Sequence, residues 1–331
     1  MTTSDFLKRN VQTPLRDTFT VAGATSEIWT NSESILAVAQ ECFPPPPKKD
    51  SLFRLRFRFW VDPAGTSQPP WPPPYFRGLG HLVFGGFDSE SSVMVDLAAQ
   101  RIVGRFSPSL AADRDYWKKV IFPRVITAIG PAIGVTELHC ACLEWKGSGL
   151  VLFGAPGAGK STLSLALALH GFSWLSEDWT YFSRDDSGVV AWGLPTGVKL
   201  LPDAVRHFPE LSNFPRSISL NREEAYQIRP ERDFGVSLAH SCRPKWLLFL
   251  ERGEEPAFDI SPLSSTEAEE RLCHDLLAQS PEVRSWQTET VRKLVQPGCW
   301  RLRYGGSAKE VASSLADFCL STAPLAERAA D

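Results

Sequence analysis

The sequence lacks a long uninterrupted hydrophobic run. The most apolar stretch beside a predicted helix, Val120 to Val135, contains Pro123 and Arg124 and is too short to span a bilayer. The first ten residues, MTTSDFLKRN, have no apolar core of the kind that a secretory signal needs. We therefore expect a cytoplasmic protein without a membrane partner.

A cysteine framework and a basic surplus are also lacking. The seven cysteines are an odd number, and no two of them form a Cys-x-x-Cys pair. This pattern argues against a disulfide-stabilised fold and a structural zinc site, and it favours buried free thiols. The formal net charge is −3, so no overall positive field favours nucleic acid as a partner.

The chain of 331 residues leaves room for two domains, and residues 1–110 predict a small β-rich unit. Residues 52–60 read L-F-R-L-R-F-R-F-W, an alternation with the period of a half-buried strand. Ser92–Leu97 and Arg101–Phe106 flank a short turn and predict a hairpin. Two proline-rich runs between residues 44 and 74 predict stiff extended connectors.

Residues 111–331 change to a pattern of helices and strands, which predicts an α/β domain. Apolar residues between Asp115 and Ile133 recur at helical spacing, and Pro123 either bends this helix or marks its start. The later elements that the pattern predicts are helices at Ser264–Gln279, Trp286–Val295 and Lys309–Cys319 and strands at Lys245–Leu250 and Trp300–Tyr304.

The motif with the clearest chemistry is G-A-P-G-A-G-K-S at residues 154–161, which matches the pattern G-x-x-x-x-G-K-[ST]. An apolar strand at Leu150–Phe153 precedes it, and a strong helix former at Ser161–His170 follows it, as a phosphate-binding loop requires. Glycines let successive backbone N–H groups approach a polyphosphate, and the helix adds its positive end. The predicted nucleotide-binding residues are Gly154, Ala155, Pro156, Gly157, Ala158, Gly159, Lys160, Ser161 and Thr162.

Two residues of this motif have separate expected roles. Lys160 supplies a compact cation for the β- and γ-phosphates, and Ser161 supplies a hydroxyl group for Mg²⁺. A predicted strand at Leu138–Trp145 and a turn at Lys146–Gly149 precede the motif, so we expect a tight hairpin to lead into the loop.

Two adjacent acids, Glu177 and Asp178, follow the next apolar strand at Phe172–Ser176. Because parallel strands end at the ligand edge of such sheets, we expect both carboxylates near the phosphates. One acid is suited to hold Mg²⁺, and the other is suited to accept a proton from an attacking hydroxyl. The alternative interpretation is a pair of surface acids in a turn.

Other polar residues leave alternatives open. His139, before the hairpin, either tunes the acid pair or is a satisfied buried histidine. Lys199 and Arg206 either stabilise transferred phosphate or, as we favour, are solvated surface charges. The run Lys245–Glu251 is similar to a Walker B strand, but we favour its interpretation as an ordinary core strand. Asp185–Gly188 predicts a turn.

The segment from His139 to Asp178 resembles the catalytic domain of bacterial HPr kinase/phosphorylase. The matching features are a histidine before a strand–turn–strand, the glycine-rich loop, the helix ended by Gly171, and an apolar strand that ends in two acids. The resemblance implies an α/β fold with a P-loop core of the HPr kinase/phosphoenolpyruvate-carboxykinase-like type, next to the smaller β-rich N-terminal unit. It also implies ATP and Mg²⁺ as cofactors and phosphoryl transfer to a hydroxyl group.

By position, the resemblance implies a role for each site residue. Lys160 would contact phosphate, and Ser161 would bind Mg²⁺. Glu177 matches the family's acid–base residue, Asp178 matches its metal ligand, and His139 matches the histidine beside the first acid. The catalytic residues that we expect are therefore Glu177, Lys160 and His139, and the expected metal ligands are Ser161 and Asp178.

The chain also departs from the family pattern. Glu177 stands where the family has an aspartate, and residues 191–202 replace a later Gly-Glu-Ile-Arg-Gly-type signature. These departures weaken the expectation of HPr as the acceptor and of a reverse reaction. We expect a kinase whose partners are a nucleotide and a hydroxyl-bearing protein, peptide or small molecule, and whose oligomeric state is open. The alternatives are a nucleotide-binding switch or ATPase that regulates a protein partner, and a relative that binds nucleotide structurally.

Overall fold

The computed structural model describes residues 11–46, 54–218, 223–253, 257–276 and 280–322. Pro47, Leu52 and Phe53, which belong to predicted elements, lie outside these residues, as do the end of the predicted helix at 264–279 and most of the C-terminal tail. The contacts divide the chain into two compact units, Met1–Val135 and Thr136–Asp331, and each mixes helices and strands. The expected α/β class is confirmed in this general form. None of the described helices is long and apolar enough to cross a bilayer.

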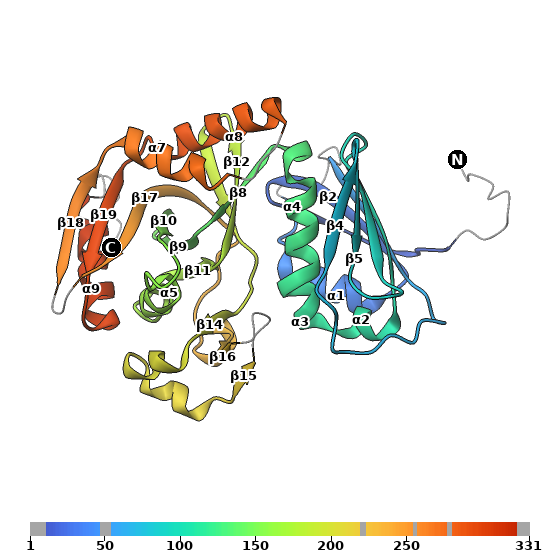
Figure 1. Ribbon diagram of the computed structural model, residues 1–331, viewed down its shortest axis with the longest axis horizontal. Helices are drawn as coiled ribbons and strands as arrows, with labels where there is room; N and C mark the ends of the chain where they lie inside the picture. The colour runs from blue at the N-terminus through green and yellow to red at the C-terminus, as the bar shows by residue number, and fades with distance from the viewer. Residues whose placement is uncertain (1–10, 47–53, 219–222, 254–256, 277–279, 323–331) are drawn as a thin grey trace. The chain divides into compact units, whose positions relative to one another are not determined.

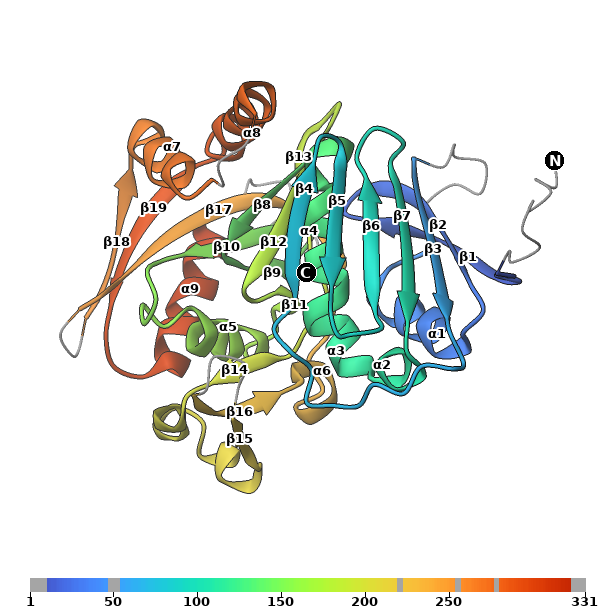
Figure 2. The ribbon, with the colours of Figure 1, turned by 45° about the vertical axis from the view of Figure 1, so that its right-hand side comes forward.

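The first unit contains a seven-stranded sheet with the order β1-β2-β3-β7-β6-β5-β4. Its strands are β1 (Leu15–Val21), β2 (Ala24–Thr30), β3 (Leu55–Val61), β4 (Tyr75–Leu79), β5 (Leu82–Gly86), β6 (Ser92–Asp96) and β7 (Arg101–Phe106). The helical segments α1 (Glu33–Cys42), α2 (Pro108–Ala112), α3 (Arg114–Tyr116), η1 (Trp117–Ile121) and α4 (Phe122–Ile133) lie against one face of this sheet (Figure 2).

Two patterns predicted for this unit are confirmed. In β3 the apolar residues Leu55, Phe57 and Phe59 are fully buried, and the alternate Arg56 and Arg58 are exposed. The strands β6 and β7 pair in antiparallel register, as the predicted hairpin requires. The alternation therefore produces a sheet with one solvent-exposed face and one face that is covered by helices.

The contacts place the boundary between the units at Val135 rather than near residue 110. Trp117 explains the difference, because its fully buried ring lies 4.7 Å from the ring of Phe106 and 5.5 Å from the ring of Phe59. The helices after residue 110 thus complete the core of the β-rich unit. Pro123 lies in the first turn of α4, and Gly134 ends that helix with a φ of 75°.

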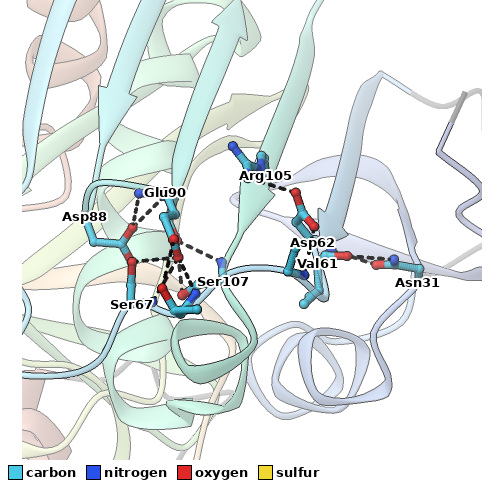
Figure 3. A network of polar contacts seen from close by, with 11 residues as sticks. Asn31, Val61, Asp62, Ser67, Asp88, Glu90, Arg105 and Ser107 are labelled. Carbon is cyan, nitrogen blue, oxygen red and sulfur yellow. Dashed lines mark hydrogen bonds and ion pairs between the residues drawn. The ribbon is translucent and has the colours of Figure 1, made fainter. Parts of the chain in front are cut away.

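The segment that connects β3 with β4 is attached to the sheet by polar contacts (Figure 3). Glu90 accepts hydrogen bonds from the backbone N–H groups of Thr66 and Ser67, at 2.7 and 2.9 Å, and from the hydroxyl group of Ser67 at 2.8 Å. Asp62 pairs with Arg105 of β7 at 2.8 Å. The start of the connector is therefore held by Glu90, in the loop between β5 and β6, and by the ion pair of its own Asp62 with Arg105 of β7.

The second unit contains a nine-stranded sheet. Its main path is β11-β9-β10-β17-β13-β12-β8, and β19 pairs with both β17 and β18. The strands are β8 (Val135–His139), β9 (Ala141–Trp145), β10 (Ser148–Phe153), β11 (Ser173–Ser176), β12 (Trp179–Asp185), β13 (Gly188–Trp192), β17 (Ser241–Arg252), β18 (Phe258–Leu263) and β19 (Cys299–Tyr304).

Helices cover both faces of this sheet (Figure 1). The helices α5 (Lys160–Leu169) and α9 (Ala308–Thr322) pack on one face, and α7 (Ser265–His274) and α8 (Pro281–Leu294) pack on the other. The strands alternate accordingly, since Leu150 and Leu152 of β10 belong to the first core and Val151 and Phe153 to the second. A strand that is buried on both faces reads as a continuous apolar run, which explains the pattern at residues 150–153.

A smaller three-stranded sheet follows the main one in the chain. It consists of β14 (Val198–Leu200), β15 (Arg216–Ile218) and β16 (Glu224–Ile228), accompanied by the short helices η2 (Pro202–Arg206), η3 (Pro209–Asn213) and α6 (Pro230–Asp233). Leu200, Phe208 and Leu211 are buried and join the core around α5. This sheet is therefore part of the second unit's core and not a separate domain.

Candidate functional site

The site is built around the loop of residues 154–159, called here the glycine loop, which joins β10 to α5. The predicted hairpin is present, because β9 and β10 pair in antiparallel register around a turn at Lys146 and Gly147. Gly159 precedes α5 with a φ of 90°, and the N–H of Leu163 donates to its carbonyl group at 2.9 Å. The loop thus leads directly into a helix whose first N–H groups have no partner within the helix.

Four strands end at the same edge of the sheet as the glycine loop. Strand β17 runs parallel to β10, and β19 runs parallel to β17. Strand β11 has the same direction as β10, because both pair antiparallel with β9. The carboxyl ends of these strands therefore bring residues together from distant parts of the chain. This edge is where open α/β sheets bind ligands.

Lys160 and Ser161 begin α5, directly after the glycine loop. The Lys160 side chain is buried, and its ammonium group donates to the carbonyl oxygen of Gly154 at 2.7 Å. The hydroxyl group of Ser161 donates a hydrogen bond to Oε1 of Glu177. The structure thus places the start of the helix, the start of the loop and the first acid in direct contact.

Glu177 is buried, with 4 % of its surface exposed. Burial first, and the charge of Asp178 second, raise the pKa of its carboxyl group, whereas Ser161 and Lys160 lower it, and the net result is a pKa of about 8. Removal from water disfavours the charged form of an acid. Glu177 is therefore a group that binds a proton far more tightly than an ordinary glutamate.

Asp178 has the opposite environment, because 64 % of its side chain is exposed. The imidazole of His139, whose Nε2 lies 3.7 Å from Oδ1, holds the pKa of this carboxyl below its usual range. His139 itself is partly exposed at the end of β8, and its ring lies 5.2 Å from the ring of Trp179. The structure places His139 beside the second acid, whereas the family resemblance implies a place beside the first.

Two further residues at this edge were not anticipated from the sequence. Tyr304, the last residue of β19, is buried, and its hydroxyl group donates to the carbonyl oxygen of Ala158 at 2.7 Å. Arg252, the last residue of β17, lies with its guanidinium carbon 5.0 Å from the centre of the Tyr304 ring. The sequence shows only that Arg252 and Tyr304 each stand at the end of an apolar strand. This position predicts a place at the glycine loop only once the strand order is known.

Gly159 gives a test of this packing. A methyl group at Gly159 would meet both the Tyr304 hydroxyl and Nη2 of Arg252, whereas one at Gly157 would meet no heavy atom within 4 Å. Both glycines have a positive φ, 90° and 81°, so both alanine variants place a side chain in the left-handed region of backbone conformation. We expect Gly159→Ala to lower the free energy of unfolding by at least about 1 kcal/mol more than Gly157→Ala. Denaturant unfolding of both variants measures this, and equal losses would contradict the packing described.

The residues present fit a magnesium ion that is shared with phosphates. Among the described residues, no three His, Cys, Asp or Glu side chains converge on a point that would hold a metal by themselves. Mg²⁺ in phosphate-transfer sites uses one or two carboxylates together with phosphate oxygens and water, which is a smaller protein contribution. The exposed carboxylate of Asp178 and the oxygen of Ser161 are of the required hard type.

The other polar residues weighed from the sequence make ordinary contacts. Lys199 pairs with Glu223 at 2.6 Å, and Arg206 is an exposed residue of η2 that lies 3.7 Å from Asp203. Glu251 lies in β17 beside Arg301, with Oε1 3.1 Å from Nε. The segment at Asp185–Gly188 is a turn, as predicted, in which Asp185 accepts from the N–H of Ser187 at 2.8 Å.

Comparison with known proteins leaves the family of this chain open. The sequence matches no protein-family model, and no curated protein is similar to it at a significant level. Among solved structures, the chain is similar to the Hpr(Ser) kinase/phosphatase from Coxiella burnetii, with a TM-score of 0.32 and 10% sequence identity. The match covers 56% of this chain and 91% of that chain. A likeness this low carries no argument, so the function is inferred from the site itself.

Proposed function

We propose that this chain is an ATP- and Mg²⁺-dependent phosphotransferase whose acceptor is a hydroxyl group. One observation carries the proposal. Beside the glycine loop lie two adjacent acids whose pKa values are shifted in opposite directions, Glu177 upward by burial and Asp178 downward by His139. A pair of acids separated in this way supports one proton-accepting role and one permanently charged role.

The glycine loop and the start of α5 would hold the phosphates of ATP. The backbone N–H groups of the glycine loop, to which Pro156 contributes none, and the positive helix end favour an anion there, and the Lys160 ammonium adds a full charge. Ser161 and Asp178 would hold Mg²⁺, which neutralises phosphate charge when bound. Lys160 already lies against the loop, so little side-chain reorganisation is needed for binding.

Glu177 would accept the proton of the attacking hydroxyl. Its raised pKa matches it to a proton that is released near neutral pH, which an ordinary glutamate holds poorly. Ser161 orients the carboxyl group through its hydrogen bond to Oε1, and burial excludes water from it. Asp178, kept ionised by His139, supplies the charge that balances the cations at this edge.

The acceptor is identified by following the transferred phosphate. We expect purified protein with γ-labelled ATP and Mg²⁺, mixed with a lysate of its own cells, to label a discrete protein or metabolite. The label should be absent with the Lys160→Ala and Glu177→Gln variants. Slow release of free phosphate that is insensitive to Glu177, with no labelled acceptor, would contradict the proposal and support a nucleotide-binding switch.

A further inference from the structure

The paired strands β17 and β19 place a cation on the glycine loop. In their parallel register Arg252 lies directly opposite Tyr304, so both side chains point to the same face of the sheet. That face carries α5, since Leu250 and Leu302, two residues earlier in each strand, pack in the core around α5. The register therefore brings Arg252 to the loop from β17, which pairs with β10, and Tyr304 from β19 on the far side of β17.

The contact between Arg252 and the loop is close. Nη2 of Arg252 lies 2.7 Å from the position that a Cβ atom on Gly159 would occupy, so the guanidinium rests where only a glycine allows it. The Tyr304 ring lies beneath the guanidinium, at 5.0 Å, and its hydroxyl group is fixed on the Ala158 carbonyl. A guanidinium stacked on an aromatic ring loses less freedom when it binds a ligand.

The charge of Arg252 is also less compensated than that of neighbouring arginines. Within the described part of the chain no carboxylate pairs with Arg252, whereas Arg271 and Arg301 both pair with Glu251 and Glu267. An exposed guanidinium beside a loop of backbone N–H groups produces a local field that favours an anion.

We propose that Arg252 is a second phosphate-binding cation, whose guanidinium contacts the phosphate chain of the nucleotide in the glycine loop, and that Tyr304 is the residue that positions it. This inference rests on the proposed function, because it assigns a further residue to the same nucleotide site. Lys160 binds from the start of α5 as a point charge, and Arg252 binds from the strand side with a planar set of donors that matches phosphate oxygens.

Binding of ATP and of inorganic tripolyphosphate, measured by calorimetry, tests the proposal. Tripolyphosphate has the phosphates of ATP without the base, so it reports on phosphate contacts alone. We expect Arg252→Gln to lower the affinity for both ligands by about tenfold or more. The affinity that remains should depend less on salt concentration. Arg252→Lys, which keeps the charge but not the planar fork, should bind both with intermediate affinity.

Arg303→Gln is the matched control. Arg303 is an exposed arginine of β19, one residue before Tyr304, and its side chain therefore points to the opposite face of the sheet. The Arg303→Gln variant loses the same charge from the same edge of the sheet, and we expect it to bind both ligands with wild-type affinity. Unchanged melting temperatures of all three variants would show that the fold is intact.

The outcomes separate this inference from the proposed function. If the wild-type chain binds ATP and Arg252→Gln binds it equally well, Arg252 has no phosphate role and the proposed function is unaffected. If Arg252→Gln weakens the binding of ATP but not that of tripolyphosphate, the proposed phosphate contact is refuted. It is also refuted if Arg303→Gln weakens the binding of both ligands as strongly as Arg252→Gln does. If the wild-type chain binds neither ligand, the proposed function itself fails.

Discussion

Replacing Lys160 with alanine is expected to weaken ATP binding about 100-fold and to abolish phosphoryl transfer. The ammonium group of Lys160 is buried against the Gly154 carbonyl, so it supplies a charge that water does not screen well. Charged hydrogen bonds of this kind contribute about 1.5–3 kcal/mol each, and phosphates accept more than one from an ammonium group. Calorimetric titration of ATP into wild type and variant measures the loss.

Lys199→Ala is the control for this prediction. Lys199 is the other lysine for which the sequence leaves a phosphate-binding role open, but it belongs to β14 and pairs with Glu223. We expect its variant to bind ATP as the wild type does. If Lys199→Ala lost affinity and Lys160→Ala kept it, the site would not lie at the glycine loop.

Replacing Glu177 with glutamine is expected to lower the rate of phosphoryl transfer by about 10²–10⁴-fold while ATP binding changes little. Glutamine has the same shape and keeps an oxygen that can accept from Ser161, but it cannot take up a proton. A pKa of about 8 leaves most Glu177 carboxyl groups protonated near neutral pH and a minority ionised to act as the base, so the substitution also removes little charge from the free protein. Steady-state rates and ATP affinity of the two proteins separate the two effects.

The same residue predicts a pH dependence of stability. The pKa of Glu177 is raised from an ordinary value of 4.5 to about 8, so the folded chain binds this proton more tightly than the unfolded chain does. Its contribution to stability is therefore full below pH 4.5 and is lost as the pH rises towards 8. Within this window the stability of the wild type relative to Glu177→Gln should fall by up to about 1.4 kcal/mol per pH unit.

The wild-type and glutamine proteins differ only in this group, so other titrations cancel in the comparison. The lowered pKa of Asp178 acts below its ordinary value of 3.8, which is outside the window. Denaturant unfolding at pH values of about 6 and about 8 measures the change. Glu210→Gln, at an exposed position in η3, should show no such trend. A difference that is the same at both pH values would refute the raised pKa.

Much of the local structure was predictable because it depends on short-range patterns. The alternation in β3 predicts which residues are buried, since successive side chains of a strand point to opposite faces. The motif at residues 154–161 predicts a strand, a loop and a helix in the correct order. The two acids at residues 177 and 178 were expected at the loop edge, and the hydrogen bond from Ser161 to Glu177 places them there.

Other features depend on contacts between distant segments. The boundary at Val135 follows from the packing of Trp117 on Phe106 and Phe59, and helical spacing alone does not say which sheet a helix covers. The place of His139 beside Asp178 depends on where β8 joins the sheet, at the far end of the path from β11. The finer assignment of the second unit to the HPr kinase type stays a prediction.

The sequence by itself determined the elements of the site and their chemical types: a glycine loop, a lysine, a hydroxyl group and two acids. Only the tertiary structure decided how those groups differ from their ordinary behaviour. The pKa of Glu177 is raised because burial removes its carboxyl group from water, and Arg252 reaches the loop because β17 lies between β10 and β19. Burial and strand order are properties of long-range packing, which local periodicity does not encode.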